Sequence, residues 1–561
     1  MSAAQTAAQA AKRVRITVDG KEVQVAADRP ILHGMLEAGV EVPHFCYHPG
    51  LSIAGNCRMC LVKVKGLPKL QVSCNTFPKE GMEVVSGDEE VARARRAVME
   101  FLLINHPLDC PVCDQAGECW LQDSAYRHGR DVGRFREEKV HKHKKQMGDL
   151  SDVLLWGERC IACSRCVRFC EEITGTGEIS LVGRGDRVVV DVHPSRPLTN
   201  PLAGNVVDVC PVGALVSKDF LYGARVWFMD FADSICPACS KGCNIRVESH
   251  QGAVKRLRPR TNLDVNGYWM CDHGRFDFKY VAEEGRLDRA WARDGDRVNY
   301  PGYAEALEKA ARGLAEVGRE FGDGALAALA DLWMTNEELL VFRDLAARLG
   351  AKEVGVLAGP LKEDEVFPGF TILGDKNPNR EGARRILGAA AVDGGLARVV
   401  SGIASGKVKG LYLHCGIPRF DPPEGFARLL ATSEFLVVHA THRSVLTDLA
   451  HIGIPGATSF EKSGTFTNAK GLTQRIRKAV APPGEVEADL AALQRLVAAI
   501  GGPAVAAFEP LSDRAIQRRL ASQVEGFAGL DPAALDRPGR GPNFLPNPFP
   551  GGPRAGGVFP A

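Results

Sequence analysis

The 561-residue chain lacks the motifs that hold a nucleotide or nicotinamide cofactor. No Gly-x-Gly-x-x-Gly follows a predicted strand, no P-loop is present, and Gly183-Arg-Gly185 is too weak a match to count. No run approaches the roughly 20 apolar residues of a membrane span. Residues 1–11 contain no apolar core of a secretory signal, and residues 1–15 are short and weakly basic for a transit peptide. The sequence therefore predicts neither a nucleotide site nor a membrane helix.

The chain also has little charge of either sign in excess. The net charge is +2, and 45% hydrophobic with 25% charged residues is ordinary soluble composition. No global field points to nucleic acid or to a membrane surface. The basic run in residues 127–145 ends in His141-Lys-His-Lys-Lys145, and we interpret it as a solvated or subunit-facing segment, with nucleic-acid binding as the minor alternative.

Cysteine is abundant but confined. Of the 17 cysteines, only Cys415 lies outside the interval from Cys46 to Cys271. Without a secretory signal, a disulfide framework is a poor interpretation, and metal ligation in a reducing compartment is the better one. Cys415 stands alone in the apolar segment Leu411-Tyr-Leu-His-Cys415, which predicts a core strand residue. The remaining cysteines form four groups with the spacing of iron–sulfur ligands.

The first group has a C-x10-C-x2-C-x13-C pattern and comprises Cys46, Cys57, Cys60 and Cys74. Four thiolates on a tight loop and one returning strand are what a [2Fe–2S] cluster needs, and Gly55-Asn56 lets the loop wrap closely, leaving N–H groups for the sulfides. A four-cysteine zinc site is the alternative. His48 is interpreted as a neighbour of the cluster and not as a ligand.

The second group has only three cysteines, so one ligand of a [4Fe–4S] cluster must come from elsewhere. His106 is expected at the end of a helix, four residues before the first of them, and imidazole is a competent iron ligand. A helix-end histidine is otherwise often structural, but the missing thiolate favours ligation. The predicted set is His106, Cys110, Cys113 and Cys119.

The third and fourth groups each predict a further [4Fe–4S] cluster. In the third, Cys160-x2-Cys163-x2-Cys166-x3-Cys170 is followed by Cys210-Pro211. The simplest set is Cys160, Cys163, Cys166 and Cys210, although spacing alone does not decide between Cys170 and Cys210. The fourth set, for which zinc is an alternative, is Cys236, Cys239, Cys243 and Cys271.

The N-terminal region is expected to fold as a ferredoxin. Residues 15–20 and 21–25 read as strands joined by an Asp19-Gly20 hairpin. Asp28 is expected to cap a short helix with Pro30 in its first turn, Leu32, Met35 and Leu36 inward, and Gly39 as its stop. Residues 88–105 look helical, because Val91, Val98, Phe101 and Leu102 repeat at helical spacing. From about residue 286, helix and strand patterns alternate as in an α/β domain.

In this order the four groups resemble the large iron–sulfur subunit, or G subunit, of NADH–quinone oxidoreductase (respiratory complex I). The resemblance is close over residues 13 to about 285. Its most specific feature is Asn105-His106-Pro-Leu-Asp-Cys110-Pro-Val-Cys113-Asp-Gln-Ala-Gly-Glu-Cys119. Gly55-Asn-Cys57-Arg-Met-Cys60 and the segment from Cys160 to Cys170 are also similar. The resemblance implies that Cys210 is a ligand and Cys170 is not.

Beyond Cys236 the chain is similar to the molybdopterin oxidoreductase fold, with Cys271-Asp-His-Gly-Arg-Phe276 and Glu461-Lys-Ser-Gly-Thr-Phe-Thr-Asn468 among its landmarks. About 276 residues follow position 285, so we expect a degenerate domain without molybdenum. The implied fold is multidomain, α+β and α/β. The predicted parts are a disordered start (1–12), a β-grasp [2Fe–2S] ferredoxin (13–90), a His/Cys3 domain (91–130), a ferredoxin-like domain (131–228), a molybdopterin-oxidoreductase-type [4Fe–4S] domain (229–285), the α/β domain (286–536) and a tail rich in Pro and Gly (537–561).

The resemblance implies an electron-transfer subunit with one [2Fe–2S] and three [4Fe–4S] clusters. Electrons from NADH would enter a flavin on a neighbouring subunit, pass through the first three clusters and leave to a ferredoxin-like subunit nearer quinone. The fourth cluster is expected off this route. Partners would be other peripheral-arm subunits on the cytoplasmic side of a bacterial inner membrane, with no nucleic acid. The alternatives are an electron-transfer subunit of a NAD-linked hydrogenase or formate dehydrogenase, and a zinc-stabilised interaction protein.

Overall fold

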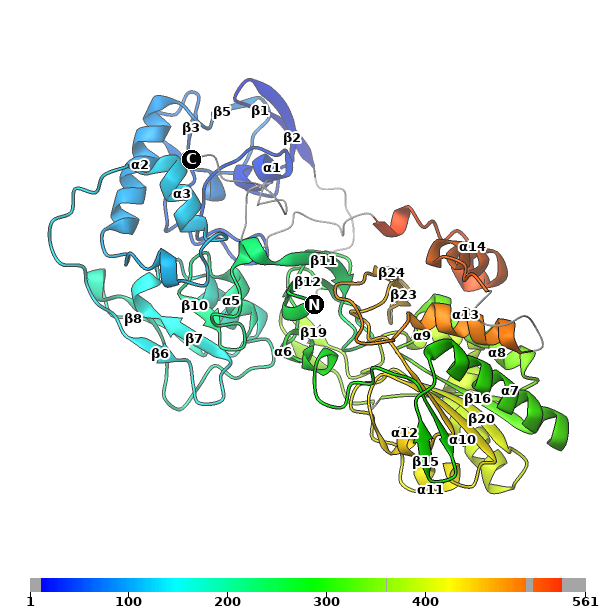
Figure 1. Cartoon of the computed structure of the whole chain (residues 1–561). Coiled ribbons are helices and arrows are strands. Elements are labelled where there is room, and N and C mark those ends of the chain that lie inside the picture. Colours follow the sequence, from blue (N-terminus) through cyan, green and yellow to red (C-terminus); the bar gives the residue numbers. More distant parts are fainter. Residues whose placement is uncertain (1–11, 360, 501–507, 537–561) are drawn as a thin grey trace.

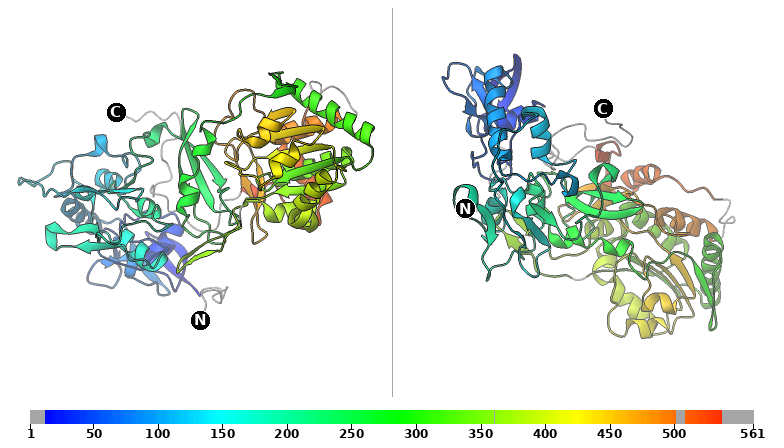
Figure 2. Two further views of the ribbon diagram at one scale, coloured as in Figure 1. Left: turned by 90° about the horizontal axis from the view of Figure 1, so that it is seen from below. Right: turned by 60° about the vertical axis from the view of Figure 1, so that its left-hand side comes forward.

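The computed structural model describes residues 12–359, 361–500 and 508–536. The cysteine-rich N-terminal half and a large α/β sheet lie at opposite ends of an elongated molecule (Figure 1). Between them lies an antiparallel sheet, which two further views also show (Figure 2). Its strands are β11 (Asp230–Ile235), β12 (Asn244–His250) and β13 (Ala253–Pro259). The prediction of a multidomain α+β and α/β fold is confirmed, whereas residues 1–11 and the tail 537–561 lie outside the described residues.

A five-stranded sheet opens the chain, in the order β2-β1-β5-β3-β4. The predicted hairpin is present, and Asp19 and Gly20 have φ of 48° and 82°, as a tight two-residue turn between antiparallel strands requires. Strand β1 pairs in parallel with β5, which gives the mixed sheet of a β-grasp ferredoxin. The strands are β1 (Arg13–Val18), β2 (Lys21–Ala26), β3 (Leu61–Val64), β4 (Gln71–Val72) and β5 (Met82–Val85).

The short helix α1 (Ile31–Glu37) packs on this sheet through Leu32 and Met35, as predicted. The prediction that Asp28 caps it is wrong. Pro30 occupies the N-cap position, and no side chain bonds to the free N–H groups of the first turn. Proline serves here because its fixed φ suits the entry to a helix.

Helix α2 (Glu89–Leu103) begins where the sequence predicts, because the Asp88 carboxylate accepts the N–H of Val91 at 2.8 Å. Val91 is buried, but Phe101, which also fits the helical spacing, is 76% exposed. At about 100° per residue, position 101 lies about 160° around the helix from the buried Met99. Helix α3 (Trp120–His128) packs against α2.

Residues 144–217 form small sheets and short helices around the third cysteine group. A three-stranded sheet has the order β10-β7-β6, and β8 pairs with β9. The end of the basic run is tied to the protein, because Lys144 lies 4.0 Å from the centre of the Trp156 ring and Lys145 pairs with Asp191. The elements are β6 (Lys144–Gln146), β7 (Val153–Trp156), α4 (Arg165–Arg168), β8 (Ile179–Val182), β9 (Val189–Val192), α5 (Asn205–Val209) and β10 (Leu215–Ser217).

The α/β region is built on a seven-stranded sheet in the order β15-β14-β22-β21-β20-β16-β17. Five strands are parallel and two antiparallel strands extend one edge. Cys415 ends β20 and is buried, which confirms the core strand expected there. The strands are β14 (Trp291–Asp294), β15 (Arg297–Asn299), β16 (Leu326–Asp331), β17 (Glu353–Leu357), β20 (Gly410–Cys415), β21 (Phe435–Ala440) and β22 (Ile452–Pro455).

Helices cover both faces of this sheet, as a parallel sheet requires. One core contains α7 (Tyr303–Phe321), α8 (Asn336–Arg348), α9 (Arg380–Leu387), α13 (Asp489–Ala499) and α14 (Asp513–Gln523). The other contains α10 (Ala389–Ala404), α11 (Phe426–Leu430) and α12 (Val445–Leu449). Among the described residues, no single helix has the length and apolar composition of a membrane span; only α9 and α10 taken together, bent by 88°, meet that test.

Two hairpins from this region reach the cysteine-rich half. The first, β18 (Glu365–Phe367) with β19 (Phe370–Ile372), donates the Gly369 N–H to the Ile173 carbonyl at 2.9 Å. The second, β23 (Gly464–Thr467) with β24 (Thr473–Ile476), contacts β11. The helix α6 (Asp272–Phe276) lies beside β13. The two halves are therefore joined by backbone contacts as well as by the chain itself.

The α/β region carries a buried ion pair between Arg286 and Glu461, whose side chains are 7% and 2% exposed. We expect Arg286→Met to lower the free energy of unfolding by about 3–5 kcal/mol, because it leaves a buried carboxylate without its cation. Arg443 pairs with Asp448 on the surface, so Arg443→Met should cost less than about 1 kcal/mol. Chemical denaturation of both variants measures the difference, and equal costs would contradict this account.

Candidate metal centres

The first cysteine group converges in the loop between α1 and β3. The Cys57 and Cys74 thiols hydrogen-bond to Cys46 and lower its pKa to about 2, and a bond from Cys74 lowers the pKa of Cys60 to about 7. Backbone N–H groups of Asn56 and Cys57 also point at the Cys46 sulfur. Gly55 has a φ of 64°, which lets the loop turn back on itself. The four sulfurs thus share one small volume lined by N–H donors.

His48 is engaged elsewhere. Its Nδ1 accepts the N–H of Gly50 at 3.1 Å, and its ring stacks on Trp269 with ring centres 5.1 Å apart. Burial and the nearby Arg165 hold the pKa of His48 well below its usual value. These contacts agree with its interpretation as a neighbour of the first group.

The second group lies where α3 begins. Cys119 is the N-cap residue of α3, and its sulfur accepts the Gln122 N–H at 3.5 Å. Cys113 and Cys119 are buried, while Cys110 is exposed. A Cβ on Gly213 would lie 2.2 Å from the Cys113 sulfur, so the residue at 213 has to be glycine for the chain to pass so close. The segment after Cys210 therefore packs directly on the second group, a contact that the spacing of cysteines does not reveal.

His106 lies just beyond α2, which ends at Leu103. Its backbone N–H donates to the Leu103 carbonyl at 3.2 Å. Burial, with Lys139 and Arg159 nearby, lowers the pKa of His106 to about 4. The ring is therefore neutral at pH 7, as a metal ligand has to be. Burial raises the pKa of the Cys113 thiol, and the positive charge of Arg159 acts against this larger effect. His106 and Cys113 are therefore both close enough to Arg159 to feel its charge.

The third group lines an apolar cavity. Its walls include Leu155, Ile161, Val190 and Leu215, together with the sulfur-bearing residues Cys160, Cys163, Cys166 and Cys210. Ala162 and Ser164 have φ of 52° and 60°, which folds the loop around the cavity, and the Ala162 N–H donates to the Cys160 sulfur at 3.4 Å. Burial raises the pKa of the Cys160, Cys163 and Cys210 thiols to about 11. Thiolates at these positions would require a bound cation.

Cys170 does not line this cavity. It lies in a π-helical turn, residues 169–173, that continues α4, and it is fully buried. Burial, with Glu178 nearby, raises the pKa of its thiol to about 12. Cys210 thus lines the cavity together with Cys160, Cys163 and Cys166, which favours it as the fourth ligand over Cys170.

The fourth group joins the ends of β11 and β12 to α6. Cys236 and Cys243 flank the turn between the strands, where the Cys236 N–H bonds to the Cys243 carbonyl at 2.8 Å. Cys271 is the N-cap residue of α6, and its sulfur accepts the Gly274 N–H at 3.4 Å. A Cβ on Gly274 would lie 2.8 Å from the Cys236 sulfur. With Cys239, all four side chains of the group are buried.

Arginines of α4 hold the first and third groups together. The Arg168 guanidinium donates to the Cys46 carbonyl at 2.6 Å and to the Cys163 carbonyl at 3.4 Å. Arg165 donates to the Tyr47 carbonyl and to the Val209 carbonyl. Both side chains are buried. The loop of one group therefore depends on the helix of the other.

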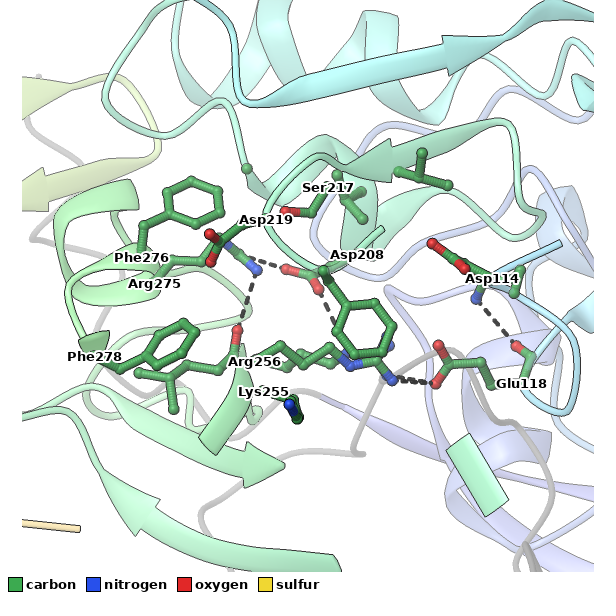
Figure 3. Close-up of a pocket in the computed structure, with 17 residues that line it drawn as sticks. Asp114, Glu118, Asp208, Ser217, Asp219, Lys255, Arg256, Arg275, Phe276 and Phe278 are labelled. Carbon is green, nitrogen blue, oxygen red and sulfur yellow. Dashed lines mark hydrogen bonds and ion pairs between the residues drawn. The ribbon is translucent and has the colours of Figure 1, made fainter. Parts of the chain in front are cut away.

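A network of charged side chains lies between the second, third and fourth cysteine groups, where they meet the sheet of β11, β12 and β13 (Figure 3). Glu118, next to Cys119, accepts from Arg256 at 2.9 Å and from Arg258 at 2.7 Å. Asp208, two residues before Cys210, pairs with Arg275 of α6. These residues line one pocket with Phe220, Phe276 and Phe278. Sequence reasoning missed this network, because its members are adjacent to cysteines in the chain but have no distinctive spacing.

Comparison with known families accounts for each of these groups. Residues 11–89 match a 2Fe-2S iron-sulfur cluster binding domain, 95–134 the NADH-ubiquinone oxidoreductase-G iron-sulfur binding region, and 152–216 the ferredoxin-like domain of NADH-quinone oxidoreductase subunit 3. Residues 229–283 match the molybdopterin oxidoreductase Fe4S4 domain and 377–499 the molybdopterin oxidoreductase family.

Curated relatives agree. The NADH-quinone oxidoreductase G subunit of Rickettsia conorii is 39% identical over 61% of this chain and 50% of its own length. The mitochondrial NADH-ubiquinone oxidoreductase 78 kDa subunit of Candida albicans is 40% identical over 61% of this chain and 47% of its own length. Over the matched residues the chain is homologous to NADH-quinone oxidoreductase G subunits.

The chain spans about half the length of the curated family members that it matches. A chain of a solved NAD+-reducing [NiFe]-hydrogenase is 31% identical and covers 38% of this chain and 91% of its own, with a TM-score of 0.35. The hydrogenase chain is a distant relative, and the likeness to oxidoreductase G subunits extends over more of this chain.

The cavity of the third group predicts different roles for Cys170 and Cys210. We expect Cys210→Ser to remove or weaken one [4Fe–4S] cluster, because it takes a sulfur from the cavity, and Cys170→Ser to leave the cluster count unchanged. Electron paramagnetic resonance of the anaerobic, reduced variants counts the clusters. Loss of a cluster in Cys170→Ser with retention in Cys210→Ser would reverse the assignment.

The shortage of one thiolate in the second group predicts a role for His106. We expect His106→Cys to keep a cluster and lower its potential, because a thiolate adds negative charge and stabilises the oxidised form. His106→Ala should weaken or lose the cluster. Redox titration followed by electron paramagnetic resonance measures both. An unchanged potential and spectrum in the two variants would mean that the fourth ligand lies elsewhere, with His48 and Cys170 the next to test.

Proposed function

We propose that the chain is the electron-transfer subunit of a NADH–quinone oxidoreductase. The observation that carries this proposal is the contiguity of the cysteine groups: the first is fastened to the third through Arg168, and the third to the second through the close approach of Gly213 to Cys113. Electron tunnelling needs carriers that are close and buried, and the chain supplies such positions in an unbroken series.

The proposed ligands are four thiolates for a [2Fe–2S] cluster and three further sets for [4Fe–4S] clusters. When bound, the clusters would supply one-electron redox chemistry. The first set is Cys46, Cys57, Cys60 and Cys74; the others are His106, Cys110, Cys113 and Cys119; Cys160, Cys163, Cys166 and Cys210; and Cys236, Cys239, Cys243 and Cys271. The buried sulfurs and the N–H groups directed at Cys46, Cys119, Cys160 and Cys271 support this assignment.

The residues around the sulfurs would tune the sites. Buried apolar walls exclude water, and N–H donors to sulfur stabilise negative charge, so both affect reduction potential. The ligand set with His106 carries one negative charge fewer than a four-thiolate set. The fourth group, held by the β11–β12 turn and α6, is proposed to lie off the main route.

We propose that the chain works within a peripheral arm, at the cytoplasmic side of a bacterial inner membrane. Its relatives are named as subunits of NADH-quinone or NADH-ubiquinone oxidoreductase, which supports other subunits of such a complex as partners. The partners proposed here are a flavin- and NADH-binding subunit and a ferredoxin-like iron–sulfur subunit. The cluster-loaded chain should be reduced by NADH only when the flavin-binding subunit is added. Reduction by NADH of the chain alone, or failure with the partner present, would contradict this proposal.

The four ligand sets predict the metal content. A two-iron cluster and three four-iron clusters amount to about 14 iron atoms per chain, and we expect no stoichiometric molybdenum or tungsten. Elemental and sulfide analysis of the anaerobic protein tests both expectations. Full cluster signals with clearly less iron, or stoichiometric zinc bound to sulfur, would refute the cluster count. Stoichiometric molybdenum would favour a dehydrogenase.

A further inference from the structure

Three buried side chains outside the cysteine groups converge in the α/β region. His414 lies near the end of β20, His439 near the end of the neighbouring β21, and Asp489 is the first residue of α13. Their side chains are at most 1% exposed. One ligand atom of each lies within 4.8 Å of the other two. The Nε2 atom of His439 is 3.3 Å from Asp489 Oδ1, and that of His414 is 3.6 Å from Asp489 Oδ2.

The second nitrogen of each ring is fixed from outside the cluster. His414 Nδ1 bonds to Asp331 Oδ2 at 2.6 Å, and His439 Nδ1 bonds to the Tyr412 hydroxyl at 2.9 Å. The Asp331 carboxylate is itself held by three backbone N–H groups, those of Trp333, Met334 and Gly416. Metal-binding histidines are oriented in this way, through the ring nitrogen that does not bind the metal.

The inward-facing nitrogens both lie against Asp489. They are at ion-pair distance from its carboxylate, 3.3 Å for His439 Nε2 and 3.6 Å for His414 Nε2. Across the described residues neither contact has hydrogen-bond geometry, and both nitrogens are fully buried. Two imidazole nitrogens and a carboxylate therefore form one buried set of ligand atoms.

The charges around the cluster favour a cation. The buried carboxylates of Glu338 and Asp489 share Lys462, whose Nζ is 2.8 Å from Glu338 and 2.7 Å from Asp489, and Asp331 lies 2.6 Å from His414 Nδ1. Three buried carboxylates thus lie around the point where the three side chains meet, which favours positive charge there.

Gly456 packs closely against the cluster. A Cβ there would lie 3.1 Å from Asp489 Oδ1 and 3.3 Å from His439 Nε2, so a larger residue would press on both atoms.

We propose that His414 Nε2, His439 Nε2 and one oxygen of Asp489 bind a divalent cation of the zinc type. Two imidazoles and a carboxylate suit Zn²⁺ better than Mg²⁺ or Ca²⁺, which prefer oxygen ligands. The ion would fasten β20 and β21 to α13, and it would take the place of the proton on His414. No cysteine takes part, so this site is independent of the proposed electron-transfer function.

The test uses the full chain with its iron–sulfur clusters, incubated anaerobically with zinc sulfate and freed of excess metal. Zinc and iron are measured together, and X-ray absorption at the zinc edge identifies the ligands. His414→Gln and His439→Gln remove the proposed ligands. His451→Gln is the matched control, because His451 lies at the other end of β21, where its Nδ1 accepts the Leu436 N–H at 3.0 Å.

We expect about one zinc per chain with nitrogen and oxygen ligands at about 2.0–2.2 Å in the wild type and in His451→Gln. His414→Gln and His439→Gln should each bind zinc at least tenfold more weakly, and Gly456→Ala should weaken it as well. Zinc should raise the melting temperature of the wild type and of the control.

A wild type that retains no zinc would overturn the proposal and leave a protonated His414 as the cation of this cluster. Zinc with sulfur ligands alone, at about 2.3 Å, would also overturn it, since it would place the metal in a cysteine group. The proposal would also be overturned if His414→Gln and His439→Gln both bound zinc with the same nitrogen and oxygen ligands as the wild type. If those variants fail to fold, the wild-type spectrum and Gly456→Ala still decide the question.

Discussion

Arg165 and Arg168 hold together two loops that lie far apart in the chain. Their guanidinium groups donate to carbonyls beside Cys46 and beside Cys163 and Cys210. Each arginine is buried, and burial lowers the pKa of Arg165 to about 10. Bonds to several fixed carbonyls offset the cost of burying such a charge. Together with the bonds from Ser52 to Glu172, they fix the first cysteine loop relative to the third.

The same solution recurs at the other contacts between cysteine groups. Glu118 and Asp208 meet arginines of β13 and α6, so a charged network fixes the residues next to Cys119, Cys210 and Cys271. The cysteine-rich half shares one apolar core, but residues 144–217 contain few long helices or strands, so charged contacts also position its short loops. In the α/β region two apolar cores lie on either side of a parallel sheet.

Local signals in the sequence predicted a good part of this architecture. The Asp19-Gly20 turn, the helix that begins after Asp88 and the buried strand ending at Cys415 each depend on neighbouring residues, and all three are confirmed. The expected cap at Asp28 is wrong, because Pro30 occupies the N-cap position of that helix.

Contacts between distant segments were beyond the reach of the sequence. The close approach of Gly213 to Cys113, and the meeting of His414, His439 and Asp489, join residues without a common motif. Cysteine spacing named the candidate ligands, yet the choice between Cys170 and Cys210 needed the cavity that only one of them lines. The spacing of cysteines identifies ligands that lie on one loop. It does not identify a further ligand that comes from a distant segment of the chain.

Mössbauer spectroscopy of the anaerobic, iron-57-labelled chain tests the central claim most directly, because it sorts all the iron by cluster type. One [2Fe–2S] and three [4Fe–4S] clusters predict that about one seventh of the iron belongs to the two-iron type and the remainder to the four-iron type. Iron confined to one cluster type, or iron outside clusters altogether, would contradict the account.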